Sequence, residues 1–413
     1  MGKPTIACQE DLSDLIPRFD QRGMDLGLER MQEALQTMGN PCGAVPAIQV
    51  VGTNGKGSIA SFLASSLKAA GIRVGLSTSP HLVSWCERIS SNGELISLTE
   101  LRQRLGALKP LAQTHRLTPF ELLLATAFDY FRSCEVELLV LEVGLGGRLD
   151  ATTAHPCRPI IAMGNIGLDH CEHLGCSLED IAAEKAAVIN PGATVISAQQ
   201  QPEVARILQN KTREQQAQMR WVSAIPADWN LGLPGILQRQ NAAVAKAALE
   251  ALTQLGWRIK EDQIRNGLAN AYWPARLQTV RWQNLPVLID GAHNPPAAEK
   301  LAQERQQWGN QKLGVCWILG LQFHKQAPTM LRYLLKPGDL AWIVPVPEHR
   351  SWTQPQLAEA CPELASQLQT ANAVEQVFAN LLTQKPWPTP PPVVAGSLYL
   401  LGDLLAKQII KAE

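Results

Sequence analysis

Short apolar runs alternate along this chain with longer segments of helical periodicity. The run AIQVV at 47–51 predicts a buried strand. In 58–70, apolar residues recur at the spacing of one helical face, and Gly71 ends the predicted helix. A second strand is predicted at 73–79. These elements form a βαβ unit with a glycine-rich stretch at its strand-to-helix junction.

The alternation continues to the end of the chain and contains no internal repeat. Further strands are predicted at 136–144, 158–165, 193–197, 285–290, 312–320, 340–346 and 391–396, and helices at 121–133, 178–189, 238–256 and after residue 290. The stretch 271–284 lacks clear periodicity and is interpreted as a domain junction. Residues 385–392 form a proline-rich connector.

The predicted fold class is α/β with two domains. The first, residues 1–275, has a P-loop-type, mostly parallel sheet with flanking helices. The second, residues 283–413, is a smaller, Rossmann-like α/β domain.

Composition excludes several classes of protein. A chain of 413 residues is longer than one ordinary hydrophobic core can organise, so two domains are expected. With 46% hydrophobic residues, the chain can bury a large core. Lysine plus arginine equals aspartate plus glutamate at 37 each, so no charge excess predicts binding to nucleic acid or an anionic membrane. Nine cysteines, an odd number without a C-x-x-C pair, indicate a reducing compartment. Without a signal peptide or an apolar run of spanning length, the expected location is cytoplasmic.

The glycine-rich stretch GTNGKGS at 52–58 predicts a phosphate-binding loop. Glycines let backbone N–H groups approach a phosphate closely, and the following helix offers its positive end. Lys56 would neutralise phosphate charge, and Ser58 offers a hydroxyl. The alternative is an ordinary glycine turn with a solvated lysine.

Polar residues at neighbouring strand ends predict a metal site beside this loop. Glu142 lies late in a buried strand, where a carboxylate needs a partner, and magnesium prefers oxygen ligands. Ser79 and His170 follow strands at the same predicted edge. Backbone amides could satisfy Glu142 instead. By spacing alone, Lys185 is a solvated helix lysine, and Asp290 is a strand-end acid that could bind ribose.

Nine segments, in this order, resemble the folylpolyglutamate synthase and dihydrofolate synthase family of the Mur ligase superfamily. They are MDLGLERM, VVGTNGKGS, STSPHL, LEVGLGGRLDAT, NIGLDHCEHLG, IAAEKAAVI, RQNAAVAKAAL, LIDGAHNP and GSLYLLGDL. The loop spelling G-T-N-G-K-G-[ST] is this family's own form. The resemblance extends over nearly the whole chain.

The resemblance implies roles position by position. ATP would be bound by Thr53, Asn54, Gly55, Lys56, Gly57, Ser58, Asn241, Arg276 and Asp290. Magnesium, as two ions, would be held by Ser79, Glu142, His170 and Lys185, the last carried as a carbamate. Lys56, Glu142, His170 and Lys185 would be the catalytic residues. The pterin substrate would lie near Asp25, Leu26, Gly27, Leu28, Thr118, Pro119, Phe120, Glu121, Leu149, Asp150 and Ala151, with His293 and Asn294 bordering the site from the second domain. The resemblance also allows a monovalent cation and suggests a monomer.

The implied reaction is ATP-dependent addition of L-glutamate to dihydropteroate and to reduced folates through an acyl phosphate, with release of ADP and phosphate. Alternatives are a folylpolyglutamate synthase alone, a Mur ligase acting on a UDP-sugar, and a nucleotide sensor without catalysis. The chain departs from the family pattern at three places: Thr153 replaces an asparagine, Ala275 replaces a glycine, and His324-Lys325-Gln326 replaces D-K-D.

Overall fold

The computed structural model describes residues 12–16, 25–308, 314–383 and 386–412. Within these ranges the chain forms two compact units, which are described separately. One contains residues up to 232 and 238–273, and the other contains 233–237 and the residues from 274 onward. Residues 233–237 cluster with the second unit although they precede residue 275. The domain limits 1–275 and 283–413 stay a prediction. No helix of the described ranges is long and apolar enough to cross a membrane.

The first unit is built on an eight-stranded sheet of order β4-β3-β2-β5-β1-β6-β7-β8. Its strands are β1 Ala47–Val51, β2 Val74–Ser77, β3 Ile89–Ser91, β4 Glu94–Leu95, β5 Leu138–Glu142, β6 Ile160–Met163, β7 Thr194–Ala198 and β8 Gln218–Val222. All pair in parallel except β3 and β4, which extend one edge in antiparallel fashion. The mostly parallel sheet predicted from the sequence is confirmed.

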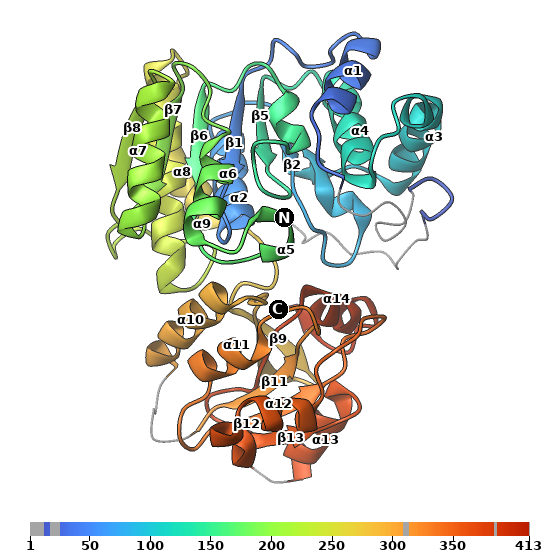
Figure 1. Ribbon diagram of the computed structural model, residues 1–413, viewed down its shortest axis with the longest axis vertical. Coiled ribbons are helices and arrows are strands. Elements are labelled where there is room, and N and C mark those ends of the chain that lie inside the picture. The colour runs from blue at the N-terminus through green and yellow to red at the C-terminus, as the bar shows by residue number, and fades with distance from the viewer. Residues whose placement is uncertain (1–11, 17–24, 309–313, 384–385, 413) are drawn as a thin grey trace. The chain divides into compact units, whose positions relative to one another are not determined.

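Helices flank this sheet on both faces (Figure 1). They are α1 Glu29–Thr37, α2 Lys56–Ala69, α3 Leu98–Thr114, α4 Pro119–Ser133, α5 Cys171–Leu174, α6 Leu178–Ala186, α7 Pro202–Glu214, α8 Ile236–Gln254 and α9 Glu261–Asn270. Helix α2, which follows the glycine loop, packs against β1, β2, β5 and α9. The sheet is therefore enclosed, as parallel sheets require.

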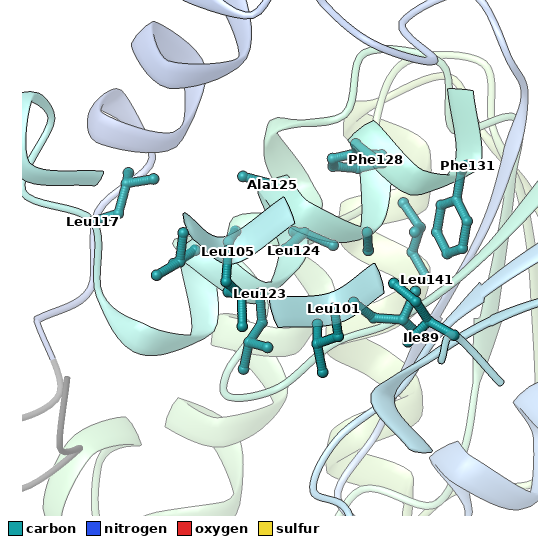
Figure 2. Packing of buried hydrophobic residues seen from close by; sticks show 14 of the residues in the cluster. Ile89, Leu101, Leu105, Leu117, Leu123, Leu124, Ala125, Phe128, Phe131 and Leu141 are labelled. Carbon is teal, nitrogen blue, oxygen red and sulfur yellow. The ribbon is translucent and has the colours of Figure 1, made fainter. Parts of the chain in front are cut away.

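One hydrophobic core lies between α1, α3, α4 and the strands β3 and β5. Figure 2 shows Leu101, Leu105, Phe128 and Phe131 gathered there with Ile89. These side chains are buried, and each contributes about 1.5–3 kcal/mol relative to an exposed position. The core holds β5 in place, and β5 ends at Glu142.

The second unit has a seven-stranded sheet of order β13-β12-β11-β14-β10-β9-β15. Its strands are β9 Gln278–Trp282, β10 Leu285–Ile289, β11 Cys316–Gly320, β12 Leu340–Val344, β13 Leu368–Thr370, β14 Val393–Ala395 and β15 Lys411–Ala412. Its helices are α10 Pro295–Glu304, α11 Ala327–Leu334, α12 Gln354–Ala360, α13 Val374–Thr383 and α14 Leu398–Ala406. Strand β9 pairs in antiparallel fashion with both β10 and β15, and the other pairings are parallel.

The interpretation of 271–284 as aperiodic was wrong for its second half. Residues 278–282 form strand β9, which pairs with β10 through a two-residue turn at Gln283 and Asn284. Both turn residues have positive φ, 46° and 69°, as expected in a tight hairpin. The strand was missed because only Val280 and Trp282 carry its short alternation.

Candidate functional site

The glycine-rich loop lies between β1 and α2 and is anchored to the segment after β6. The N–H groups of Thr53 and Asn54 donate to the carbonyl of Asn165 at 2.7 and 3.1 Å. The Thr53 hydroxyl donates to the Gly167 carbonyl at 2.9 Å and lies 3.1 Å from the Gly167 N–H, which donates to it. Thr53 thus attaches the loop to the segment that leads to His170.

Two glycines of this loop are required by close contacts. Gly55, at the start of α2, has φ 87°, and a Cβ there would lie 2.5 Å from Oδ1 of Asn241. A Cβ on Gly57 would lie 2.7 Å from the ring of Trp273. The structure therefore brings Asn241, a predicted ATP-binding residue on α8, beside the loop. Trp273 is a neighbour that sequence reasoning missed.

The loop also presents polar groups suited to a phosphate. Helix α2 begins at Lys56, and its first N–H groups have no partner within the helix. The Lys56 ammonium donates to the carbonyls of Gly52 and Thr53, at 3.1 and 3.2 Å, and so lies over the loop. The Ser58 hydroxyl is buried and has no hydrogen-bond partner among the described residues. A buried, unpaired hydroxyl at this place fits a bound phosphate or its cation.

The predicted metal residues are only partly brought together. Glu142 is buried at the end of β5, and its carboxylate accepts from the backbone N–H of Ser79 at 3.1 Å. His170 has φ 51°, with its imidazole 3.8 Å from the carboxylate of Asp169 and 3.9 Å from that of Glu172. Across the described ranges, no three His, Cys, Asp or Glu side chains are grouped to hold a metal. The structure thus places Ser79 beside Glu142, and the hydroxyl and carboxylate oxygens of these two residues are donors that suit magnesium.

Lys185 is buried, and its interpretation as a solvated helix lysine was wrong. Its side chain lies within the protein with the amine 3.4 Å from the carbonyl of Gly146. Burial, and after it the charge of Lys56, lowers the pKa of this amine to about 7, while Asp169 and Asp150 oppose the change. A large fraction of the amine is neutral near pH 7, which is the form that reacts as a nucleophile.

The three segments predicted to surround the pterin are brought together. Arg30, which sequence reasoning missed, donates to the carboxylates of Asp25 at 2.7 Å and Glu121 at 3.2 Å. Glu121 also forms a capping box with Thr118 at the start of α4, where Pro119 is the first helical residue. Phe120 lies against the loop after β5, because a Cβ on Gly144 would be 2.9 Å from its ring.

Asp150 organises the loop that follows β5. Its buried carboxylate accepts from the N–H groups of Gly144 and Leu145, at 2.9 and 3.1 Å, and from the N–H and hydroxyl of Thr152. Burial raises the pKa of Asp150, and these hydrogen bonds oppose the rise. The neighbouring Leu149 and Ala151 are thereby fixed in place.

Comparison with known proteins identifies the family. Residues 50–219 match the Mur ligase middle domain, and residues 274–407 match the dihydrofolate synthetase C-terminal domain. A dihydrofolate synthase/folylpolyglutamate synthase of Bacillus subtilis is 36% identical over 326 residues, covering 71% of this chain and 75% of that protein. The chain belongs to the dihydrofolate synthase/folylpolyglutamate synthase family of Mur ligases.

Solved structures of this family share the fold. The structure of Escherichia coli FolC in complex with DHPP and ADP has a TM-score of 0.82 and 28% identity, covering 96% of this chain and 95% of that chain. A bifunctional folylpolyglutamate synthase/dihydrofolate synthase with manganese, AMPPNP and L-glutamate bound has a TM-score of 0.81 and 28% identity, covering 94% and 96%. The family, the α/β fold and the ligase class predicted from the sequence are confirmed.

The remaining residues singled out by the family pattern lie in the second unit. The Asp290 carboxylate accepts from the N–H groups of Leu277 and Ala292, at 3.0 and 2.9 Å. Burial raises its pKa, and Arg276 counteracts this. His293 contacts the Gly291 carbonyl through Nδ1 at 2.7 Å. Asn294 is buried and caps α10 by accepting from the N–H of Ala297.

The departures from the family pattern have different structural settings. Ala275 is buried and has φ 57°, a left-handed conformation that explains why the family prefers glycine there. His324-Lys325-Gln326 precedes α11, and the Lys325 N–H donates to the Gln322 carbonyl. Thr153 accepts from the amide of Gln49, far away in the sequence, and donates to the Gly147 carbonyl.

Proposed function

We propose that this chain adds L-glutamate to dihydropteroate, forming dihydrofolate, and to reduced folates, forming polyglutamates. The observation that carries the proposal is the glycine loop with its buried, unpaired Ser58 hydroxyl, beside the Ser79–Glu142 pair, in a chain of this family. The nucleotides, the manganese, the DHPP and the glutamate named for solved relatives support ATP, a divalent cation, a pterin and glutamate as ligands.

The reaction needs activation because oxide is a poor leaving group from a carboxylate. A carboxylate oxygen of the pterin substrate attacks the γ-phosphorus of ATP, and ADP leaves. The glutamate nitrogen then attacks the carbonyl carbon of the acyl phosphate, loses a proton, and phosphate leaves. Both steps depend mainly on positioning and on stabilising charge.

In this mechanism the loop residues hold the nucleotide. The N–H groups at the start of α2 and the Lys56 ammonium would bind the phosphates, and Asn241, beside Gly55, would orient the nucleotide. Asp290 and Arg276 are proposed for the same ligand, and His293 and Asn294 for the border of the site. The segments of Asp25–Leu28, Thr118–Glu121 and Leu149–Ala151 would hold the pterin.

Two magnesium ions, when bound, would neutralise charge on the transferring phosphoryl group. Ser79, Glu142, His170 and Lys185 are proposed to hold them. Lys185 would do so as a carbamate, which replaces a cation by an oxygen ligand, and its burial with a neutral amine supports that modification. The monomeric state, the cytoplasmic location and a monovalent cation remain predictions.

The test is phosphate release with ATP, magnesium and glutamate, comparing dihydropteroate with a reduced folate in parallel assays. Release that depends on both pterins supports the bifunctional enzyme, and release with the reduced folate alone supports a folylpolyglutamate synthase. Background release that neither pterin changes would refute the proposal. The variant Lys56→Met should abolish pterin-dependent release and thereby exclude a contaminating ligase.

A further inference from the structure

A buried polar side chain occupies the middle of the central strand. Gln49 lies in β1 between β5 and β6, and it is 0% exposed. Its amide nitrogen donates to the hydroxyls of Thr152 at 2.9 Å and Thr153 at 2.8 Å, and its carbonyl accepts from Arg158 at 2.5 Å. Both protons of the amide are therefore used, and none of these partners is a substrate group.

Thr153 links Gln49 to the loop after β5 by hydrogen bonds. Its hydroxyl accepts from Gln49 and donates to the Gly147 carbonyl at 2.8 Å. Gly147 packs directly on α6, since a Cβ there would lie 2.9 Å from the Glu184 carbonyl and 3.2 Å from Cα of Lys185. The next carbonyl back, that of Gly146, is the one to which the Lys185 amine donates.

A second branch runs from Gln49 to Asp150. The Thr152 hydroxyl accepts from Gln49 and donates to the Asp150 carboxylate at 2.5 Å. At the other end, Arg158 donates to Gln49 and to the carbonyls of His155 and Val188. A cation and a carboxylate are thus connected through two neutral groups. Such chains polarise each bond in turn, and a missing member leaves buried groups unpaired.

We propose that Gln49 and Thr153 are positioning residues, which hold the loop 144–150 against α6 and so place Lys185 and the pterin-binding segment at 149–151. The inference rests on the proposed function. In this view Thr153 aligns the loop, at a position where the family pattern has an asparagine. Thr153 acts through its hydrogen bond to Gly147, and Gln49 acts on Asp150 through Thr152.

The test compares Thr153→Val with Thr153→Ser. Valine has nearly the same shape but leaves one Gln49 N–H without a partner and the Gly147 carbonyl with only the Asp150 N–H, whereas serine keeps the hydroxyl. We expect Thr153→Val to lower kcat about tenfold and to weaken dihydropteroate binding by a similar factor. KM for ATP should change by less than about twofold, because the glycine loop is anchored through Asn165 and Gly167. Serine should restore kcat and dihydropteroate binding.

Equilibrium binding of dihydropteroate, followed by its own fluorescence, provides a readout apart from turnover. Thr212→Val is the matched control, since this buried hydroxyl donates to the Leu208 carbonyl of its own helix. If Thr153→Val and Thr212→Val both match the wild type in kcat and pterin binding, the proposal is overturned. If Thr153→Val does not fold, Gln49→Met removes the same hydrogen bond from its other end, and wild-type values there would overturn the proposal equally. Absence of pterin-dependent release by the wild type would instead refute the proposed function.

Discussion

The charge of Lys56 acts on the buried amine of Lys185 and adds to the larger effect of burial, so that the pKa of Lys185 falls to about 7. In the unfolded chain this amine keeps its ordinary value of 10.5. Between these values the unfolded state binds one proton more than the native state, so stability rises with pH from about 7 to 10.5. Below pH 7 both states are protonated, and the native state carries the full cost of the buried charge.

We therefore predict that Lys185→Met flattens this rise, which amounts to ~1.4 kcal/mol per pH unit for one proton. Urea unfolding of both proteins between pH 7 and 10, in buffer freed of carbon dioxide, measures the two slopes. Equal slopes would show that Lys185 keeps an ordinary pKa. Lys56→Met should give an intermediate result, because it removes the smaller of the two causes.

A neutral buried amine should also react with carbon dioxide. We expect protein incubated with ¹³C-bicarbonate and magnesium to show one carbamate carbon signal that Lys185→Ala lacks. Lys56→Met should weaken the signal, since a higher pKa leaves less neutral amine. A wild-type spectrum without that signal would contradict the carbamate and leave the amine itself beside Gly146.

The two helical glycines Gly57 and Gly106 should respond oppositely to alanine. In α2, the new Cβ of Gly57→Ala would meet the Trp273 ring at 2.7 Å, whereas nothing lies within 4 Å of that position at Gly106 in α3. Gly57→Ala should destabilise the protein by about 1–3 kcal/mol and weaken ADP binding. Gly106→Ala should stabilise it by up to about 1 kcal/mol. Chemical unfolding and calorimetric titration with ADP test both, and effects of the same sign would disprove the close contact.

Local sequence patterns predicted the strand and the acid at which the candidate site begins. The site residues that these patterns missed are held by contacts between distant parts of the chain. The strand at 47–51 and the acid at Glu142 could be predicted because a buried run and its end are read directly from neighbouring residues. The contact of Arg30 with Glu121 spans 91 residues, and that of Arg158 with Gln49 spans 109. No periodicity encodes such pairs. The burial of Lys185 likewise depends on the loop after β5, which a helical pattern does not reveal.

Two histidines, the partly buried His81 and the buried His155, should make the protein sensitive to acid. Burial, and then Arg88, lowers the pKa of His81 to about 3, and His81 Nδ1 accepts from Arg88. Burial lowers the pKa of His155 to about 4, although its contact with the Val45 carbonyl opposes this. Below pH 6.5 these two histidines become protonated in the unfolded chain but stay neutral in the native state. The free energy of unfolding therefore falls with pH until the native pKa values are reached.

We expect His81→Gln and His155→Gln each to reduce the loss of stability between pH 6.5 and 4.5, and the double variant to reduce it further. The full slope of one such histidine is ~1.4 kcal/mol per pH unit. Guanidinium unfolding at several pH values gives the comparison. Slopes unchanged in all three variants would mean that other groups cause the acid sensitivity.

The carboxylate of Asp339 should be the most costly one to remove from the second unit. It is completely buried and accepts from both terminal nitrogens of Arg305, from the Val315 and Lys336 N–H groups, and from the Trp317 indole. Asp339→Ala would leave the partly buried Arg305 guanidinium, the two N–H groups and the indole without this acceptor, and should cost about 3–5 kcal/mol.

Asp403→Ala is the control, because it breaks a more exposed pair with Lys407 and should cost less than about 1 kcal/mol. Adding Arg305→Met to Asp339→Ala should recover part of the loss, since the unpaired, partly buried charge is then removed as well. Urea unfolding of the single and double variants measures the coupling. A double variant whose loss equals the sum of the two single losses would mean that the pair acts as two independent residues, contrary to the bidentate contact.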